Sequence, residues 1–189
     1  VSAFSLNPMK PLGALGEAGV VLTDDKKIVD KISSLRYLGT EDIEFCEDPD
    51  LNHKIDELQA LWLMERLKKL DKILNKRRSI ATYFSETFPE EVRIIGIEDL
   101  ERTTFFEFTI EVDKRNELQE YLKRELISSR VKHPVLVCDQ PGYSKEYIEE
   151  IPNARRLINK ILSLPLYNSL TDKQCEHISK SLKSFFKKD

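Results

Sequence analysis

Apolar and polar positions recur with different periods along the chain, and each period predicts a different element. The run Gly19-Val20-Val21-Leu22-Thr23 is continuously apolar and follows a stretch broken by prolines and glycines, which predicts a short buried strand. Apolar residues then recur at helical spacing over residues 23–37, where Ile28, Ile32 and Leu35 share one face. The first part of the chain is therefore expected to hold a strand followed by a helix.

The strongest helical pattern extends from Ile55 to Phe88 and predicts one long, continuous helix. Its apolar positions, spaced by four, three and four residues, form one stripe: Leu63, Leu67, Leu70 and Leu74. A helix of about 30 residues spans roughly 45 Å, so we expect a strut between two domains. If the stripe normally packs against a domain outside this chain, its leucines should be exposed and should favour association.

After Pro89 the pattern changes to one that is typical of a mixed domain. Phe106, Phe108, Ile110 and Val112 alternate with polar residues, which predicts a half-buried strand. The same reasoning predicts helices over residues 113–126, 153–160 and 173–186 and a strand over 161–166. Residues 95–189 are therefore expected to form a compact α+β unit.

Composition narrows the class of protein. The chain has 189 residues, of which 40% are hydrophobic and 33% charged, so it can bury a core and is not a disordered tail. Its net charge of -3 gives no general attraction to nucleic acid or anionic lipid, and no apolar run is long enough for a membrane helix. The three cysteines form no CxxC pair. We therefore expect a cytoplasmic protein with no metal site, no disulfide framework, no nucleic-acid partner and no membrane partner.

Lys10 is the first candidate for chemistry. It lies between Pro8 and Pro11, and glycines follow at every third position, 13, 16 and 19. The segment is not a dinucleotide fingerprint, because no Gly-x-Gly-x-x-Gly occurs. It is not a P-loop either, because the lysine precedes the glycines and no Gly-Lys-Ser/Thr occurs. A lysine held in constrained backbone can become a nucleophile that forms a Schiff base with a carbonyl. From spacing alone, a surface lysine in a turn is the interpretation that the pattern favours.

The whole segment resembles the cofactor-lysine region of the DegT/DnrJ/EryC1/StrS family of pyridoxal-phosphate-dependent sugar aminotransferases. That family carries a pattern close to Ser-Phe-x-x-x-Lys-x-x-Gly-x-x-Gly-(Glu/Asp)-x-Gly, and Leu6 stands here at the Phe position. The residues in register are Ser5, Lys10, Gly13, Gly16, Glu17, Gly19 and Thr23. Later segments that also resemble the family are 35–39, 52–60, 77–83, 140–143 and 162–165.

The resemblance implies roles for three residues. Lys10 would bind pyridoxal phosphate covalently and then move a proton between substrate and cofactor, which requires an unprotonated amine. Ser5 would donate its hydroxyl to the cofactor phosphate, and Asn52 would reach the phosphate bound in the other subunit of a homodimer. Judged without the resemblance, Ser5 could cap a turn and Asn52 could be the N-cap of the long helix.

Two departures from the family pattern concern the substrate end of the site. The family often has Asn-x-Arg where this chain has Asn52-His53-Lys54, and lysine lacks the bidentate fork of arginine. Aligning a family His-Tyr-Pro motif on Pro134 places Lys132 and His133 there. Lys54, Lys132 and His133 are thus candidate substrate-binding residues, with Lys132 facing a diphosphate. Alternatively, His133 is simply a partly buried histidine.

The implied fold class is α/β, with an α+β small domain: the C-terminal part of a PLP-transferase fold type I aminotransferase with a long interdomain helix. Residues 1–54 would be the end of the large cofactor domain, 55–94 the interdomain helix and linker, and 95–189 the small domain. The implied function is transfer of an amino group, from a donor such as glutamate, to a nucleotide-linked keto-sugar for cell-surface polysaccharide synthesis.

In the family, other cofactor-binding groups lie in a domain that precedes this segment. The chain alone is therefore expected to be inactive, and whether it binds pyridoxal phosphate by itself stays open. The second hypothesis is a non-catalytic truncated or split product that acts only as a folding and association module.

Overall fold

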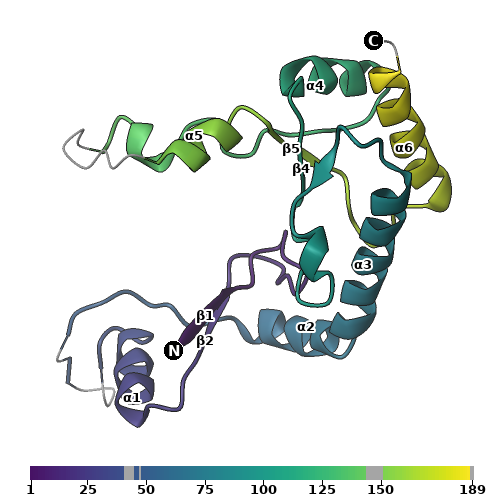
Figure 1. Cartoon of the computed structure of the whole chain (residues 1–189). Coiled ribbons are helices and arrows are strands. Elements are labelled where there is room, and N and C mark those ends of the chain that lie inside the picture. The colour runs from purple at the N-terminus through teal and green to yellow at the C-terminus, as the bar shows by residue number, and fades with distance from the viewer. Residues whose placement is uncertain (41–44, 47, 144–150, 188–189) are drawn as a thin grey trace. The chain divides into compact units, whose positions relative to one another are not determined.

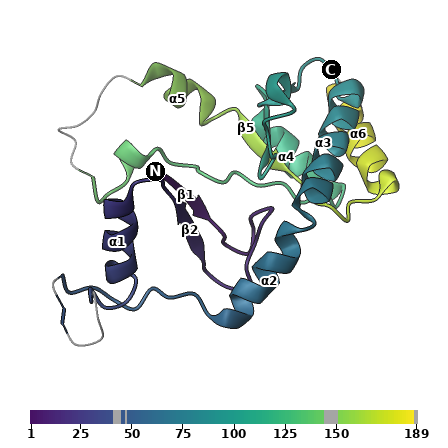
Figure 2. The ribbon, with the colours of Figure 1, turned by 90° about the horizontal axis from the view of Figure 1, so that it is seen from below.

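The structure is a computed structural model that describes residues 1–40, 45–46, 48–143 and 151–187. It divides into two compact units, Val1–Lys72 and Ile73–Asp189. In the first unit β1 (Ser2–Ser5) pairs antiparallel with β2 (Gly19–Leu22), and Ser5 lies opposite Gly19. Two helices, α1 (Lys26–Leu35) and α2 (Glu57–Leu67), flank this hairpin (Figure 2). The first unit is therefore a ribbon and two helices.

The apolar run at residues 19–23 does form a strand, β2, but the expectation that it is buried is wrong. Val20, Val21 and Leu22 are all exposed. The cause is that β2 pairs with β1 alone in a two-stranded sheet, and the described residues leave both strands open to solvent. An apolar run of this length predicts burial only when another layer covers it.

The long helix predicted from Ile55 to Phe88 is divided. α2 ends at Leu67 and α3 (Leu70–Thr87) begins after a turn at Lys68 and Lys69. There the Lys69 amide donates to the carbonyl of Arg66, three residues back, at 2.9 Å, instead of four residues back. The leucine stripe is divided as well: Leu63 is 9% exposed and packs with Leu6 and Ala14, whereas Leu67 is 57% exposed.

The second unit contains a three-stranded antiparallel sheet with the order β3-β4-β5, and Figure 1 shows α3 and α6 side by side beside it. Its strands are β3 (Arg93–Ile94), β4 (Phe108–Glu111) and β5 (Ile161–Leu164). Its further helices are α4 (Arg115–Arg124), α5 (Pro152–Leu157), α6 (Asp172–Phe186) and the 3-10 turns η1 (Ile97–Asp99) and η2 (Val137–Asp139).

The core of the second unit follows the predicted alternation. Phe108, Ile110 and Val112 are almost fully buried, and the Phe108 ring packs in a tilted arrangement on the Phe84 ring of α3, with 5.3 Å between the ring centres. The helix predicted at 173–186 is confirmed, and Thr171 and Gln174 form a capping box at its start. The predicted mixture of helices and strands after Pro89 is therefore what the chain forms.

Arg77 of α3 holds the irregular segment that leads into β4. Its guanidinium donates to the carbonyls of Thr104 (3.1 Å), Phe105 (2.5 Å) and Phe106 (3.2 Å). Phe105 is buried with a positive φ of 44°, a conformation that side chains rarely adopt. Burial lowers the pKa of Arg77 from its ordinary value. Among the described residues, backbone carbonyls compensate the buried charge, and these bonds fix the path of the segment.

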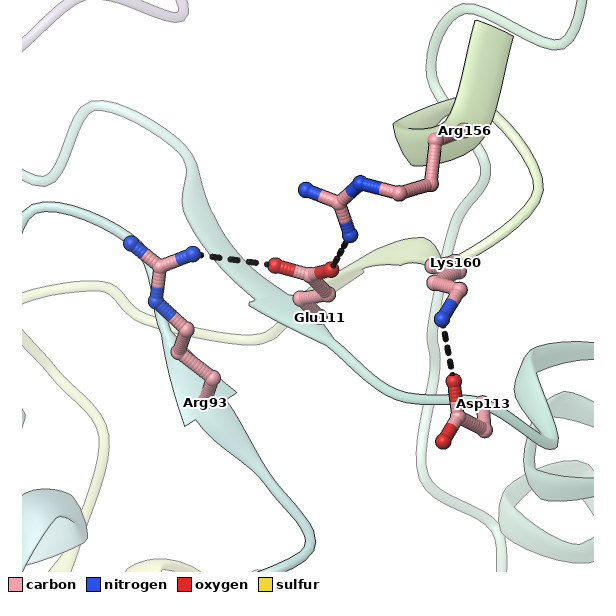
Figure 3. A network of polar contacts seen from close by, with 5 residues as sticks. All are labelled: Arg93, Glu111, Asp113, Arg156 and Lys160. Atoms are coloured by element: carbon pink, nitrogen blue, oxygen red, sulfur yellow. Dashed lines mark hydrogen bonds and ion pairs between the residues drawn. The ribbon is translucent and has the colours of Figure 1, made fainter. Parts of the chain in front are cut away.

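Glu111 at the end of β4 joins two strands and a helix through ion pairs (Figure 3). One carboxylate oxygen is 3.1 Å from Arg93 of β3, and the other accepts from Arg156 of α5. Beside this group Asp113 accepts from Lys160 at 2.5 Å. The hydrogen bond from Arg156, and then the one from Arg93, lower the pKa of Glu111. Because the carboxylate is mostly covered, its negative charge depends on these partners.

We expect Arg77→Met to lower the free energy of unfolding by about 3 kcal/mol, because buried carbonyls lose charged donors. Urea denaturation followed by circular dichroism measures this change. Arg102→Met is the matched control, since Arg102 is 87% exposed and lies 3.9 Å from Asp99. A loss at Arg77 no larger than that at Arg102 would contradict the assignment.

The lowered pKa of Glu111 also predicts a pH dependence. Its contribution to stability is fully present above the ordinary value of 4.5 and is lost as the pH falls through the lower pKa of the folded state. As the pH falls from 4.5 to the lower pKa of the folded state, the free energy of unfolding should therefore decrease more for the wild-type chain than for Glu111→Gln. Urea titrations at several acidic pH values measure the two slopes, with Glu90→Gln, at an exposed position, as control. Equal slopes for wild type and Glu111→Gln would refute the prediction.

Candidate active site

Lys10 lies on the connection between β1 and β2, residues 6–18, which is ordered by its own backbone. The Leu6 amide donates to the carbonyl of Ala18, and the Ala14 amide donates to the carbonyl of Leu6, both at 2.8 Å. The Lys10 amide closes a turn onto the carbonyl of Asn7, also at 2.8 Å. The segment is therefore a folded loop that holds Lys10 in a defined turn.

Ser5, at the end of β1, lies at the start of this loop. Its hydroxyl oxygen accepts the Asn7 amide at 3.3 Å. The Asn7 side chain accepts the Met9 amide at 2.9 Å and donates to Glu17 at 2.6 Å. Ser5 therefore caps the turn, as its alternative interpretation predicts. Because its oxygen acts here as an acceptor, the hydroxyl hydrogen stays available for donation to another group.

Two of the glycines after Lys10 differ in how much space surrounds them. A Cβ atom at Gly13 would lie 2.5 Å from the carbonyl oxygen of Pro8, a distance that real Cβ atoms do not adopt. A Cβ atom at Gly16 would lie 3.5 Å from Gln59, an ordinary contact. Gly13 is thus required for the close approach of the two sides of the loop.

One face of α2 fastens the loop through three polar side chains. Gln59 accepts the Gly16 amide at 2.9 Å. Trp62 donates its indole N–H to the carbonyl of Gly13 at 3.1 Å, and Arg66 donates to the carbonyl of Pro11 at 2.9 Å. All three contacts end on backbone atoms of the loop.

An apolar contact supports the same face. Leu63 of α2 packs with Leu6 and Ala14, at the base of the loop. The sequence reasoning did not assign Trp62 or Arg66 to the site. The signal that could have found them is their helical spacing from Gln59, three and seven residues on, with Leu63 between them.

Asn52 and Lys54 lie on a different segment of the first unit, beside the end of α1. Asn52 forms an isolated bridge with Tyr37, and its side chain accepts the Lys54 amide at 3.2 Å. The interpretation of Asn52 as a helix N-cap is wrong, because the N-cap of α2 is Asp56. The Lys54 ammonium lies 3.9 Å from the centre of the Tyr37 ring, a cation–π contact.

Lys132 and His133 belong to the second unit. The Lys132 ammonium is 2.5 Å from a Glu107 carboxylate oxygen and 4.6 Å from the centre of the Phe106 ring. His133 is exposed, so its alternative interpretation as a partly buried histidine is wrong. The candidate substrate residues therefore differ: Lys132 is held by two neighbours, while His133 faces solvent.

The described residues contain neither a membrane-spanning helix nor a metal-binding cluster. None of their helices has both the length and the apolar character needed to cross a membrane. Within the same ranges, no cluster of three or more histidine, cysteine, aspartate or glutamate side chains could hold a metal ion.

We expect Gly13→Ala to loosen the loop, because the added methyl group must push the Pro8 carbonyl away. Hydrogen exchange at the Ala14 amide should become about tenfold faster or more, the equivalent of a 1–3 kcal/mol overpacking cost. Gly16→Ala is the matched control and should leave the rate near that of wild type. Equal rates in the two variants would show that the loop is not closed in this way.

Comparison with known proteins places this geometry in a family. The family model for DegT/DnrJ/EryC1/StrS aminotransferases matches residues 1–183. A pleiotropic regulatory protein from Geobacillus stearothermophilus is 27% identical over 98% of this chain and 52% of its own length. A dTDP-3-amino-3,4,6-trideoxy-alpha-D-glucose transaminase from Micromonospora megalomicea subsp. nigra is 30% identical over 89% of this chain and 48% of its own length.

Solved structures agree with the sequence matches. The chain superimposes on a DegT DnrJ EryC1 StrS aminotransferase from Brucella abortus with a TM-score of 0.90 and 27% identity, covering 97% of this chain and 50% of that one. The predicted fold, part of an aminotransferase of this class, is therefore confirmed. The chain spans about half the length of the curated relatives it matches. With a family model that extends over nearly all of its residues, the chain belongs to the DegT/DnrJ/EryC1/StrS aminotransferase family.

Proposed function

We propose that this chain carries the lysine-bearing part of a pyridoxal-phosphate-dependent aminotransferase that acts on a nucleotide-linked keto-sugar. The observation that carries the proposal is Lys10 itself, held in a closed turn of a loop whose backbone is fastened to α2. The family is pyridoxal-phosphate-dependent. A primary amine fixed in this way is the group that this class of cofactor requires.

The donors on the loop fit the cofactor. Pyridoxal phosphate presents an aldehyde and a phosphate, and the loop carries a primary amine at Lys10 and a hydroxyl donor at Ser5. When bound, the cofactor supplies an electron sink for the carbon that loses its proton. Lys10 would hold the cofactor, Ser5 would donate to its phosphate, and Asn52 would donate its amide to the phosphate in the other subunit of a homodimer.

Lys10 also has a role as a base in this proposal. Its Nζ atom would take a proton from the substrate carbon and return it to the cofactor, which requires the amine to be neutral at that point. The turn at Lys10 fixes the backbone from which this side chain extends. The Lys10 side chain therefore extends from a fixed backbone position.

The substrate end of the site would be formed by basic side chains. Lys132 would meet the diphosphate of a nucleotide sugar, with glutamate as the amino donor, and Lys54 and His133 are further candidate substrate-binding residues. The Micromonospora relative is named for a dTDP-sugar, which supports this substrate class. Glu107 now pairs with Lys132, so a diphosphate would have to compete with it. The free thiols of Cys46, Cys138 and Cys175 fit a cytoplasmic setting.

A second candidate function is an association module without catalysis. The observation that favours it is the number of exposed apolar side chains on the hairpin and on α2, among them Phe4, Leu22, Leu61 and Leu67. Sedimentation velocity distinguishes this candidate: stable self-association without any cofactor binding would support it, and a clean monomer would count against it.

The main proposal is tested by adding pyridoxal phosphate to the chain and recording its visible spectrum. We expect an absorption band from the bond between Lys10 Nζ and the cofactor aldehyde, and its loss in Lys10→Ala. Lys26→Ala is the control, because Lys26 is an exposed lysine on α1. A band that persists unchanged in Lys10→Ala would overturn the proposal, and no band in the wild-type chain would favour the association module.

A further inference from the structure

We propose that Arg66 and Trp62 are positioning residues for Lys10, which set the backbone from which its amine reaches the cofactor. The inference rests on the proposed function of Lys10. Neither residue is expected to touch the substrate; each acts through the loop. Arg66 and Trp62 thus set the backbone position of Lys10 and take part in no step of the reaction.

Arg66 fixes the residue that directly follows Lys10. Pro11 has no amide hydrogen, so its carbonyl is its one backbone group for hydrogen bonding, and Arg66 donates to it at 2.9 Å. On the other side, the Lys10 amide is bound to the Asn7 carbonyl at 2.8 Å. The backbone is thus held immediately before and after the Lys10 side chain.

Trp62 supports the same arrangement from one turn earlier on α2. Its indole N–H donates to the Gly13 carbonyl at 3.1 Å, and the centre of its ring lies 5.8 Å from the Arg66 guanidinium carbon. The Arg66 Nε atom is buried and has no hydrogen-bond partner among the described residues. The orientation of this guanidinium therefore depends on the Pro11 carbonyl and the Trp62 ring.

The apolar and polar contacts of α2 act on different parts of the loop. Leu63 holds Leu6 and Ala14, where the loop begins and returns, by burial. Arg66 holds Pro11, in the middle part of the loop, directly after Lys10. Loss of Arg66 should thus leave the base of the loop in place and release the part next to the lysine. A residue needed only for folding would not show this local effect.

The test measures how readily each lysine reacts with the cofactor. Pyridoxal phosphate is added to the chain, the lysine amine condenses with the aldehyde and releases water, and borohydride delivers hydride to the carbon–nitrogen double bond. Mass spectrometry of peptides then gives the trapped fraction at Lys10 relative to Lys26 in the same sample, across a range of pH. The wild-type chain should show a clear preference for Lys10.

Arg66→Met should lower the Lys10-to-Lys26 ratio about tenfold, as expected when a charge-assisted hydrogen bond is lost. Trp62→Phe, which keeps a ring and removes the N–H donor, should lower the ratio less. Arg66→Lys, which keeps a cationic donor, should restore part of it. Lys69→Met, at an exposed position just past α2, is the control and should leave the ratio unchanged. Hydrogen exchange of α2 amides confirms that each variant is folded.

The outcomes separate the two claims. If the wild-type chain shows no preference for Lys10, the proposed function fails, and the positioning role fails with it. If the wild-type chain prefers Lys10 but folded Arg66→Met keeps the same ratio, only the positioning role is overturned. Should Arg66→Met not fold, the ratio in Trp62→Phe decides: a ratio equal to wild type overturns the role, and a lower ratio supports it.

Discussion

Irregular backbone in this chain is held by hydrogen bonds from helix side chains to carbonyl oxygens. A loop that leaves regular structure must pair its backbone polar groups elsewhere, and burial makes that requirement strict. In the first unit Arg66 and Trp62 of α2 serve the loop that carries Lys10. In the second unit Arg77 of α3 serves the segment that enters β4. Each unit thus uses a cation on a helix to shape a loop.

Much of the second unit could be predicted because its pattern is local. The alternation at Phe108, Ile110 and Val112 gave both the strand and its buried face, since a sheet with helices on one side requires that period. The helix after Thr171 could be predicted from sequence as well, because its cap and its apolar face lie within one segment. In both cases the residues that determine the structure are neighbours in the sequence.

The errors arose where a partner distant in sequence decides the structure. The burial of β2 depends on a covering layer, which no pattern in the strand itself can report. The turn at Lys68 and Lys69 falls among good helix formers, so propensity favoured one continuous helix. The contacts of Trp62 and Arg66 end on carbonyls some fifty residues earlier, and backbone acceptors leave no trace in a sequence motif.

Part of the glycine and lysine pattern of the loop could be predicted because Gly13 and Lys10 each meet a geometric requirement of the backbone. Gly13 has no space for a Cβ atom, and the Lys10 amide closes a turn onto the Asn7 carbonyl. The candidates for the second cofactor-phosphate contact and for the substrate could not be predicted together in the same way, because they lie on separate segments. Asn52 and Lys54 lie near the end of α1, while Lys132 is in the other unit with Glu107.

The contacts from α2 to the loop also bear on how such a site can diverge. Because Gln59, Trp62 and Arg66 bind backbone atoms, the identity of the loop's exposed side chains does not matter to them. Met9 and Leu15 are 63% and 62% exposed and contribute nothing to this attachment. Such positions can therefore be exchanged in evolution or by design while the hydrogen bonds that hold the backbone around Lys10 are kept. Within one short loop, the atoms that fix the backbone are separate from the side chains that are free to vary.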